Sequence, residues 1–162
     1  MEILLKGNPT AVEGTWPALN EDAPDFTVYD LNDQAVSKDS LKGKVVLIST
    51  FPNIDTRVCD IQTRKFFELT ATLDDVLILN LSNNDKENLS NWCATQGVDS
   101  YMLRDVDQSF AHSYGIWLPE LSHLARSIFV LNRDGVLVYS ELVPEVTQEP
   151  NYEKAVEAAK HA

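Results

Sequence analysis

Residues 44–69 read KVVLISTFPNIDTRVCDIQTRKFFEL, and they contain a strand pattern, a turn and a helix pattern in succession. The apolar run 44–51 predicts a buried strand, Pro52 predicts a turn, and the periodicity of 60–69 predicts a helix. Cys59 then lies near the start of that helix, where unpaired backbone N–H groups and the positive end of the helix dipole favour a thiolate. Because the thiolate is the nucleophilic form of cysteine, we expect Cys59 to attack a substrate.

Length and charge limit the classes of function. The chain has 162 residues, with 13 basic and 25 acidic side chains and a formal net charge of -12. This length predicts a single domain over residues 1–162. The negative charge argues against nucleic acid and anionic membrane surfaces as partners. No apolar run reaches the length of a membrane span, and the N-terminus does not read as a signal peptide, so we expect a cytoplasmic protein.

Strand and helix patterns alternate along the rest of the chain. Two hairpins are predicted, one within residues 3–14 that turns at 7–9, and one within 126–143 that turns at 133–135. Further predicted strands are 26–30, 35–37, 76–82 and 100–104, the predicted helices are 84–97, 107–114 and 151–160, and 116–124 reads as irregular. This order indicates an α/β protein with a thioredoxin-like fold, in which helices flank a central mixed β-sheet and an N-terminal β-hairpin precedes it.

Pro52, Thr56 and Cys59 have the spacing Pro-x-x-x-Thr-x-x-Cys, in which each residue type has a chemical use. Pro52 shapes the turn and shields the sulfur without offering an N–H donor. Thr56 lies three residues before Cys59, so its hydroxyl is expected on the sulfur's side of the first turn, able to accept from an incoming hydroxyl group. A lone cysteine is most often a small buried apolar residue, but a position at a helix start favours a reactive one.

Residues 51–59 resemble the peroxidatic loop of peroxiredoxins, in particular that of the bacterial thiol peroxidases, which are of the atypical two-cysteine type. The likeness covers nearly the whole chain, because other segments are similar to the same family: 5–9, 23–26, 124–126, 139–145 and 149–150. One position departs from the family, which usually has a small residue where this chain has Arg57. The Arg57 side chain either points to solvent or adds positive potential at the site.

The resemblance implies a peroxidase that reduces hydrogen peroxide and organic hydroperoxides without haem or metal. Cys59 would attack a peroxide oxygen and become a sulfenic acid. Thr56 would orient the peroxide, Pro52 would shield the sulfur, and Arg126 would stabilise the thiolate and polarise the peroxide. Cys93 would be the resolving cysteine and form an intramolecular disulfide with Cys59. The resemblance also implies a dithiol reductant such as thioredoxin, and a homodimer.

The residues alone leave other interpretations open. Arg126 also fits a solvated charge at the start of a strand, and Cys93 fits a buried helix residue beside Trp92. A thiol-disulfide oxidoreductase of the same fold usually has Cys-x-x-Cys, whereas Cys93 follows Cys59 by 34 positions. A non-enzymatic redox-binding module with two inert thiols is a third interpretation. Because a disulfide needs Cα atoms within about 7 Å, we expect the helix turns around both cysteines to rearrange on oxidation.

Other side chains are predicted to be structural. His112, His123 and His161 lack the spacing of metal ligands, which argues against a metal site. Arg64 is expected on the solvated face of its helix. The apolar residues later in the same helix are expected in the core: Phe66, Phe67 and Leu69. The apolar stretch 117–121 is either local packing or part of a substrate or dimer surface.

Overall fold

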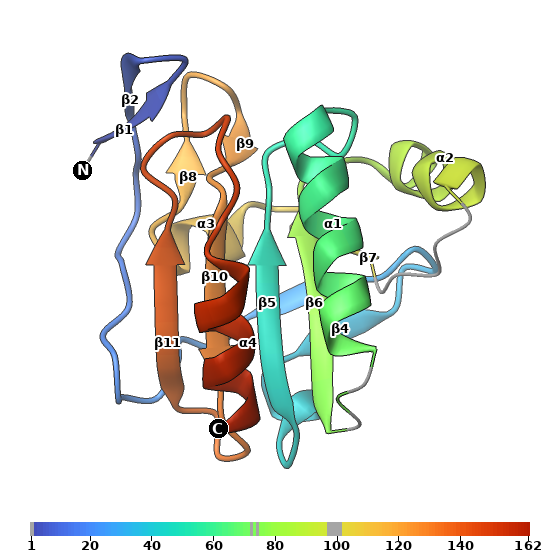
Figure 1. Cartoon of the computed structure of the whole chain (residues 1–162), viewed down its shortest axis with the longest axis vertical. Coiled ribbons are helices and arrows are strands. Elements are labelled where there is room, and N and C mark those ends of the chain that lie inside the picture. The colour runs from blue at the N-terminus through green and yellow to red at the C-terminus, as the bar shows by residue number, and fades with distance from the viewer. Residues whose placement is uncertain (1, 72, 74, 97–101) are drawn as a thin grey trace.

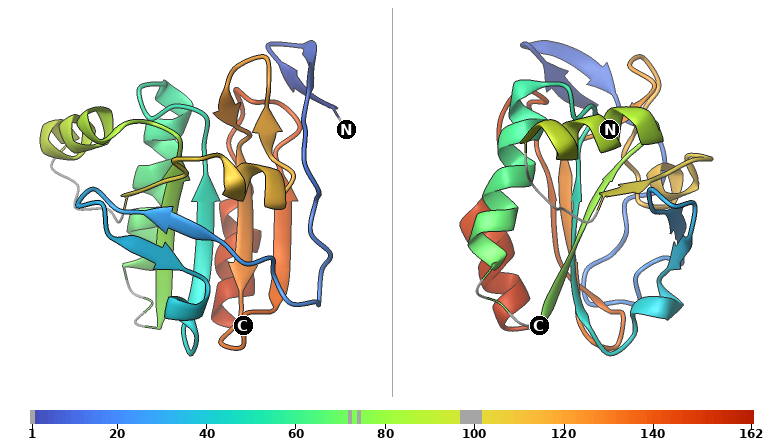
Figure 2. Two further views of the ribbon diagram at one scale, coloured as in Figure 1. Left: turned by 180° about the vertical axis from the view of Figure 1, so that it is seen from behind. Right: turned by 90° about the vertical axis from the view of Figure 1, so that its right-hand side faces the viewer.

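The computed structural model describes residues 2–71, 73, 75–96 and 102–162. A central β-sheet is covered on one face by helices α1 (Arg57–Thr70) and α4 (Tyr152–Lys160), and α3 (Ser109–Ser113) lies on the opposite face (Figures 1 and 2). Helix α2 (Lys86–Gln96) lies beside the N-terminal end of α1 rather than over the middle of the sheet (Figure 1). The predicted α/β layering is confirmed.

Seven strands form the central sheet in the order β11-β10-β5-β6-β7-β3-β4. Their bounds are β3 Thr27–Tyr29, β4 Ala35–Ser37, β5 Val45–Thr50, β6 Val76–Ser82, β7 Met102–Arg104, β10 Ser127–Leu131 and β11 Leu137–Leu142. Strands β5, β6 and β7 are parallel to one another, whereas β10, β11, β3 and β4 each pair antiparallel with their neighbours. The predicted mixed sheet is confirmed. Because β10 is antiparallel to β5, it begins at the edge of the sheet where β5 ends.

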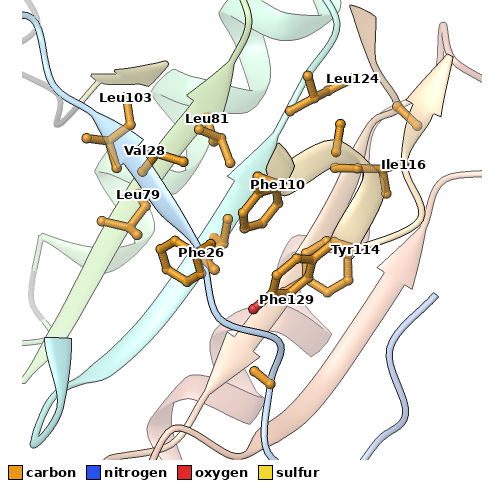
Figure 3. Packing of buried hydrophobic residues seen from close by; sticks show 14 of the residues in the cluster. Phe26, Val28, Leu79, Leu81, Leu103, Phe110, Tyr114, Ile116, Leu124 and Phe129 are labelled. Atoms are coloured by element: carbon orange, nitrogen blue, oxygen red, sulfur yellow. The ribbon is translucent and has the colours of Figure 1, made fainter. Parts of the chain in front are cut away.

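Strand β5 is buried along its whole length because layers of structure cover both of its faces. Successive side chains of a strand point to opposite faces. Val46 packs in a cluster with the rings of Phe110 and Phe129, the two rings shown with their neighbours in Figure 3. Val45 packs on the other face with Phe66 of α1. This double coverage fixes α1 on the sheet and places the start of the helix at the carboxyl end of β5.

The N-terminal hairpin is confirmed, with a shorter turn than the sequence predicted. Strands β1 (Glu2–Leu5) and β2 (Asn8–Ala11) pair with each other, so Pro9 belongs to β2 and not to the turn. The turn consists of Lys6 and Gly7, whose φ angles are 50° and 83°. Positive φ at both central residues is typical of the tightest two-residue hairpin turns.

Two predictions about local structure are wrong. Residues 116–124 contain a short hairpin, in which β8 (Trp117–Leu118) pairs with β9 (His123–Leu124), where irregular chain was expected. Phe67, expected in the core, is 46% exposed. The reason is that helix α1 turns only one face to the sheet, and the fully buried Phe66 occupies that face.

The remaining predicted elements agree with the structure wherever it describes them. Helices α3 and α4 match the predicted helices 107–114 and 151–160 to within two residues at each end. The predicted strand 100–104 and helix 84–97 extend into residues 97–101, which lie outside the described residues, and their described parts form β7 and α2. Within the described part of the chain, no helix has the length and apolar character needed to cross a bilayer.

Candidate active site

Cys59 lies in the first turn of α1, as the sequence predicted. The loop 51–56 leads from β5 to this helix, and Thr56 is the N-cap residue of the helix. The Cys59 side chain is 0% exposed. It packs in an apolar group that we name the cysteine cluster, which consists of Phe51, Ile54, Cys59, Leu89, Trp92 and Met102.

The second cysteine packs against the same cluster. Cys93 belongs to α2, and its side chain is partly buried against the cysteine cluster. Both Cys59 and Cys93 are present as thiols. The fold therefore brings the two predicted redox cysteines to one apolar region, from two helices that are well separated in the sequence.

Asn84, which the sequence placed only at the start of the predicted helix 84–97, holds the loop that carries the active-site spacing. Its Oδ1 accepts a hydrogen bond of 2.9 Å from the backbone N–H of Ile54, and its Nδ2 donates to Asn53 Oδ1 at 3.1 Å. The same Asn53 oxygen accepts from the N–H of Asp55 at 3.0 Å. Asn84 is buried just after β6, so the loop is fixed to the sheet by a satisfied polar contact.

Thr56 and Pro52 lie on the side of the loop that faces the solvent-accessible pocket described below. The hydroxyl of Thr56 donates to the carbonyl oxygen of Asn53 at 2.8 Å, so its hydrogen is used within the loop. The lone pairs of that hydroxyl remain suited to accept a hydrogen bond from a ligand. Pro52 is buried, and it lines the same pocket as Thr56.

Arg126 is buried, which excludes the interpretation as a solvated strand-end charge. It directly precedes β10 and is 2% exposed. Its Nε donates to the carbonyl oxygen of Val146 at 2.9 Å, and its Nη1 donates to Gln62 Oε1 at 2.7 Å. Both acceptors are neutral, so these bonds orient the guanidinium without cancelling its positive charge.

Gln62, which the sequence reading did not single out, connects Arg126 to the helix of Cys59. It lies three residues after Cys59, on an adjacent part of the helix surface, and is completely buried. Its Nε2 donates to Ser49 Oγ at 2.6 Å and to the carbonyl oxygen of Thr50 at 3.1 Å. The amide is therefore satisfied at both ends, and Arg126 is bonded to a residue one helical turn after the cysteine.

A pocket of about 540 Å³ brings Pro52, Thr56 and Arg126 together. Its lining residues are Leu5, Lys6, Pro52, Asn53, Thr56, Arg57, Val58, Leu121, His123, Arg126, Val146 and Thr147. The pocket thus unites three of the predicted site residues with the N-terminal hairpin and with the segment after β11. Cys59 is not part of the lining, although its neighbour Val58 is. The stretch 117–121 was expected to serve either local packing or a substrate or dimer surface. In the structure Leu118 packs in the core, and Leu121 lines the pocket.

His123 contributes an imidazole to the pocket wall in a defined tautomer. Asn83 Nδ2 donates to the carbonyl oxygen of Ser122, so Asn83 Oδ1 acts as an acceptor for His123 Nδ1 at 2.8 Å. This network assigns the proton to Nδ1. Burial lowers the pKa of the imidazole and so favours the neutral ring.

No group of three His, Cys, Asp or Glu side chains that could hold a metal occurs among the described residues.

A polar contact joins the helix of Cys59 to the helix of Cys93. Asp60 Oδ1 accepts from Trp92 Nε1 at 2.8 Å and from Arg64 Nε at 3.3 Å. The Arg64 guanidinium also lies over the Trp92 ring, 5.9 Å from its centroid. The prediction of a solvated Arg64 is therefore wrong, because the side chain is half-buried between the two helices. In the sequence Asp60 follows Cys59 and Trp92 precedes Cys93. This hydrogen bond therefore joins the immediate neighbours of the two cysteines.

Known proteins are similar to this chain in sequence over nearly its full length. The family model described as Redoxin matches residues 18–156. The thiol peroxidase of Bacillus subtilis is 44% identical over 161 residues, covering 98% of this chain and 96% of its own. The thiol peroxidase of Halalkalibacterium halodurans is 46% identical over 162 residues, covering 99% of this chain and 98% of its own.

Solved structures agree with the fold. A peroxiredoxin-like protein from Aquifex aeolicus superposes with a TM-score of 0.92 and 29% identity, covering 99% of this chain and 96% of its own. The thiol peroxidase from Chromobacterium violaceum has a TM-score of 0.89 at 15% identity, with the same coverage of the two chains, and this likeness concerns the fold alone. The chain therefore belongs to the redoxin family and, within it, to the thiol peroxidases.

Proposed function

We propose that this protein is a thiol-dependent peroxidase that reduces hydrogen peroxide and organic hydroperoxides to water and alcohols through Cys59. The observation that carries the proposal is the pocket that joins Pro52, Thr56 and Arg126 at the start of the helix that bears Cys59. The family membership supports the same reaction. The alternative of a thiol-disulfide oxidoreductase has less support, because the two cysteines lie in separate helices.

The chemistry begins at the sulfur of Cys59. Its thiolate attacks the peroxide oxygen that carries hydrogen, an S–O bond forms and the O–O bond breaks, and Cys59 becomes a sulfenic acid. The departing oxygen takes up the proton that the Cys59 thiol released on ionising and leaves as water or an alcohol. Arg126 offers a fixed positive charge for the thiolate and for the departing oxygen. Thr56 Oγ1 accepts a hydrogen bond from the peroxide. Because Cys59 is 0% exposed, contact with the peroxide requires a small movement of the residues that cover it.

Cys93 is proposed to resolve the sulfenic acid. Its sulfur attacks the Cys59 sulfur, a disulfide forms, and the hydroxyl of the sulfenic acid leaves as water. The packing of both cysteines against one cluster supports this pairing. Rearrangement of the helix turns on oxidation stays a prediction.

We propose that a dithiol protein such as thioredoxin is the reductant. We also propose that the chain folds as one domain, assembles as a homodimer and is located in the cytoplasm. The relatives from Bacillus subtilis and Halalkalibacterium halodurans are thiol peroxidases, which supports a thiol reductant. The homodimer rests on the family resemblance, and the cytoplasm on the sequence.

Replacing each cysteine by serine tests the assigned roles. We expect Cys59→Ser to abolish peroxide consumption in a thioredoxin-coupled assay, because no sulfenic acid can form. Cys93→Ser should consume about one equivalent of peroxide and then stop, because the disulfide that thioredoxin reduces is missing. Full turnover by the Cys59→Ser variant would end the proposal.

Gln62→Leu tests how Arg126 is positioned. The substitution removes the acceptor for Arg126 Nη1 and the donor to Ser49 and Thr50. We expect the rate constant for reaction with hydrogen peroxide to fall about tenfold or more, since misplaced electrostatic groups lose much of their effect. Stopped-flow kinetics would measure it. The matched control Gln34→Leu makes the same change at an exposed turn residue and should react like wild type; an equal loss in both variants would refute the role of Gln62.

Trp92 fluorescence tests the predicted rearrangement. If forming the disulfide moves the turn that carries Cys93, the bond from Trp92 Nε1 to Asp60 breaks and the indole becomes more solvated. We expect the emission to shift to longer wavelength on oxidation in wild type and in Trp16→Phe, and not in Trp92→Phe. An oxidised protein with a verified Cys59–Cys93 disulfide and unchanged Trp92 emission would contradict the rearrangement.

A further inference from the structure

The pocket beside Arg126 has a charge opposite to that of the protein. The chain has a formal net charge of -12, with 25 acidic and 13 basic side chains. The lining of the pocket nevertheless includes three cationic side chains, those of Lys6, Arg57 and Arg126, and none of its described lining residues is Asp or Glu. Such a local reversal of sign concentrates anions from solution in the pocket.

The three cations have different surroundings. Arg126 is buried and bonded to Gln62 and Val146. Lys6 and Arg57 are exposed, and among the described residues neither takes part in an ion pair within 4.0 Å. Two positive charges at the open side of the pocket are therefore available to a ligand.

The backbone positions of both exposed cations are fixed by secondary structure. Arg57 is the first residue of α1, so its charge adds to the positive end of the helix dipole. Lys6 lies in the turn of the N-terminal hairpin, which is attached where Leu4 bonds to the backbone of Pro144 and Val146 at 2.7 and 2.8 Å.

Beside this turn lies the carboxylate of Glu145, which is bonded to backbone donors. Its oxygens accept from the backbone N–H of Gly7 at 2.8 Å and of Thr147 at 3.0 Å. The hydrogen bonds from Thr147 and Gly7 lower its pKa, so it remains an anion bound to backbone donors. It is not part of the pocket lining.

The wall between the cations is largely apolar. Leu5, Val58, Leu121 and Val146 contribute to it, together with the neutral imidazole of His123. A ligand that fits all of these surfaces has a hydroperoxide group directed to Arg126, an apolar middle and a negative end near Lys6 or Arg57. Hydrogen peroxide satisfies only the first of these features.

We propose that the pocket selects organic hydroperoxides that carry a carboxylate, and that Arg57 and Lys6 are the residues that determine this selectivity. The inference rests on the proposed peroxidase function. It answers the question that the sequence left open at Arg57: the side chain is both exposed and part of the pocket, where its charge favours an anionic substrate over a neutral one of the same shape.

The test compares two hydroperoxides that differ in charge and otherwise only by one methyl group. The probes are para-carboxycumene hydroperoxide and its methyl ester, and the measured quantity is the ratio of their kcat/KM values, acid over ester, at one pH. We expect a ratio of about five to ten in wild type, as two charges near a partly exposed site provide. The ratio should approach one when salt is raised from about 0.01 M to about 1 M, because the screening length falls from about 30 Å to about 3 Å.

Charge-removing variants assign the effect to residues. Arg57→Gln and Lys6→Gln should each lower the ratio about two- to threefold, and the double variant should bring it close to one. The control Lys44→Gln removes the same charge from an exposed position at the opposite end of β5 and should leave the ratio unchanged.

Failure of this inference is distinguishable from failure of the proposed function. If wild type consumes the ester and hydrogen peroxide but shows an acid-over-ester ratio of one, or if Lys44→Gln lowers the ratio as much as Arg57→Gln, the selectivity is refuted and the peroxidase remains. If wild type consumes none of the three peroxides, both fall together.

Discussion

A buried positive charge, bonded to a residue one helical turn after a buried cysteine, is the constraint on which the rest of the structure depends. Arg126 is 2% exposed, and burial of a guanidinium is tolerated only when its donors find acceptors. Its acceptors come from Gln62 in α1 and from Val146 after β11. Helix α1, strand β10 and the C-terminal segment must therefore meet at one edge of the sheet. The antiparallel pairing that places Ser127 opposite Thr50 brings them there.

Helix α1 is attached to its surroundings on two different sides near Cys59. Asp60 bonds to Trp92 of α2, and Gln62 bonds to Arg126. Asp60 and Gln62 are two residues apart, which corresponds to a rotation of about 200° around the helix axis. Their side chains therefore point in nearly opposite directions. Separation of α2 from α1 breaks only the first attachment. The chain can therefore move Cys93 for disulfide formation while Arg126 keeps its bond to the helix of Cys59.

The electrostatics of the pocket differ from those of the molecular surface around it. Carboxylates dominate the chain, yet the pocket collects Lys6, Arg57 and Arg126 from three separate segments. Only the folded structure places the hairpin turn, the start of α1 and the residue before β10 side by side. This convergence connects the catalytic proposal with the selectivity proposal, because both invoke the positive charges of the same pocket.

The sequence predicted those parts of the fold that a simple periodicity encodes. A wholly apolar strand, a proline turn and a helix pattern were enough to place Cys59 at the start of α1, and the family resemblance added Arg126. Gln62 was not identified because a glutamine inside a helix reads as solvated, and only the position of Arg126 shows why it is buried. The role of Asn84 was not identified because local patterns cannot show that its side chain reaches the loop before α1.

Two errors have the same physical origin. Arg64 was expected in solvent, but the neighbouring helix α2 covers that side of α1 and offers the ring of Trp92. The short hairpin of β8 and β9 has strands of two residues, too short for an alternating pattern to be recognised. In both cases a tertiary contact decides the local state, and such contacts leave little trace in the neighbouring sequence.

The central claim is that the charge of Arg126 makes the sulfur of Cys59 reactive toward peroxides. The most direct measurement is the second-order rate constant for sulfenic acid formation at Cys59 by stopped flow, in wild type and in Arg126→Gln, with folding of both confirmed by thermal unfolding. The account predicts a rate constant at least about 100-fold lower in the variant, the size of loss typical when a preorganised electrostatic group is removed. A folded Arg126→Gln variant that reacts within about twofold of wild type would contradict it.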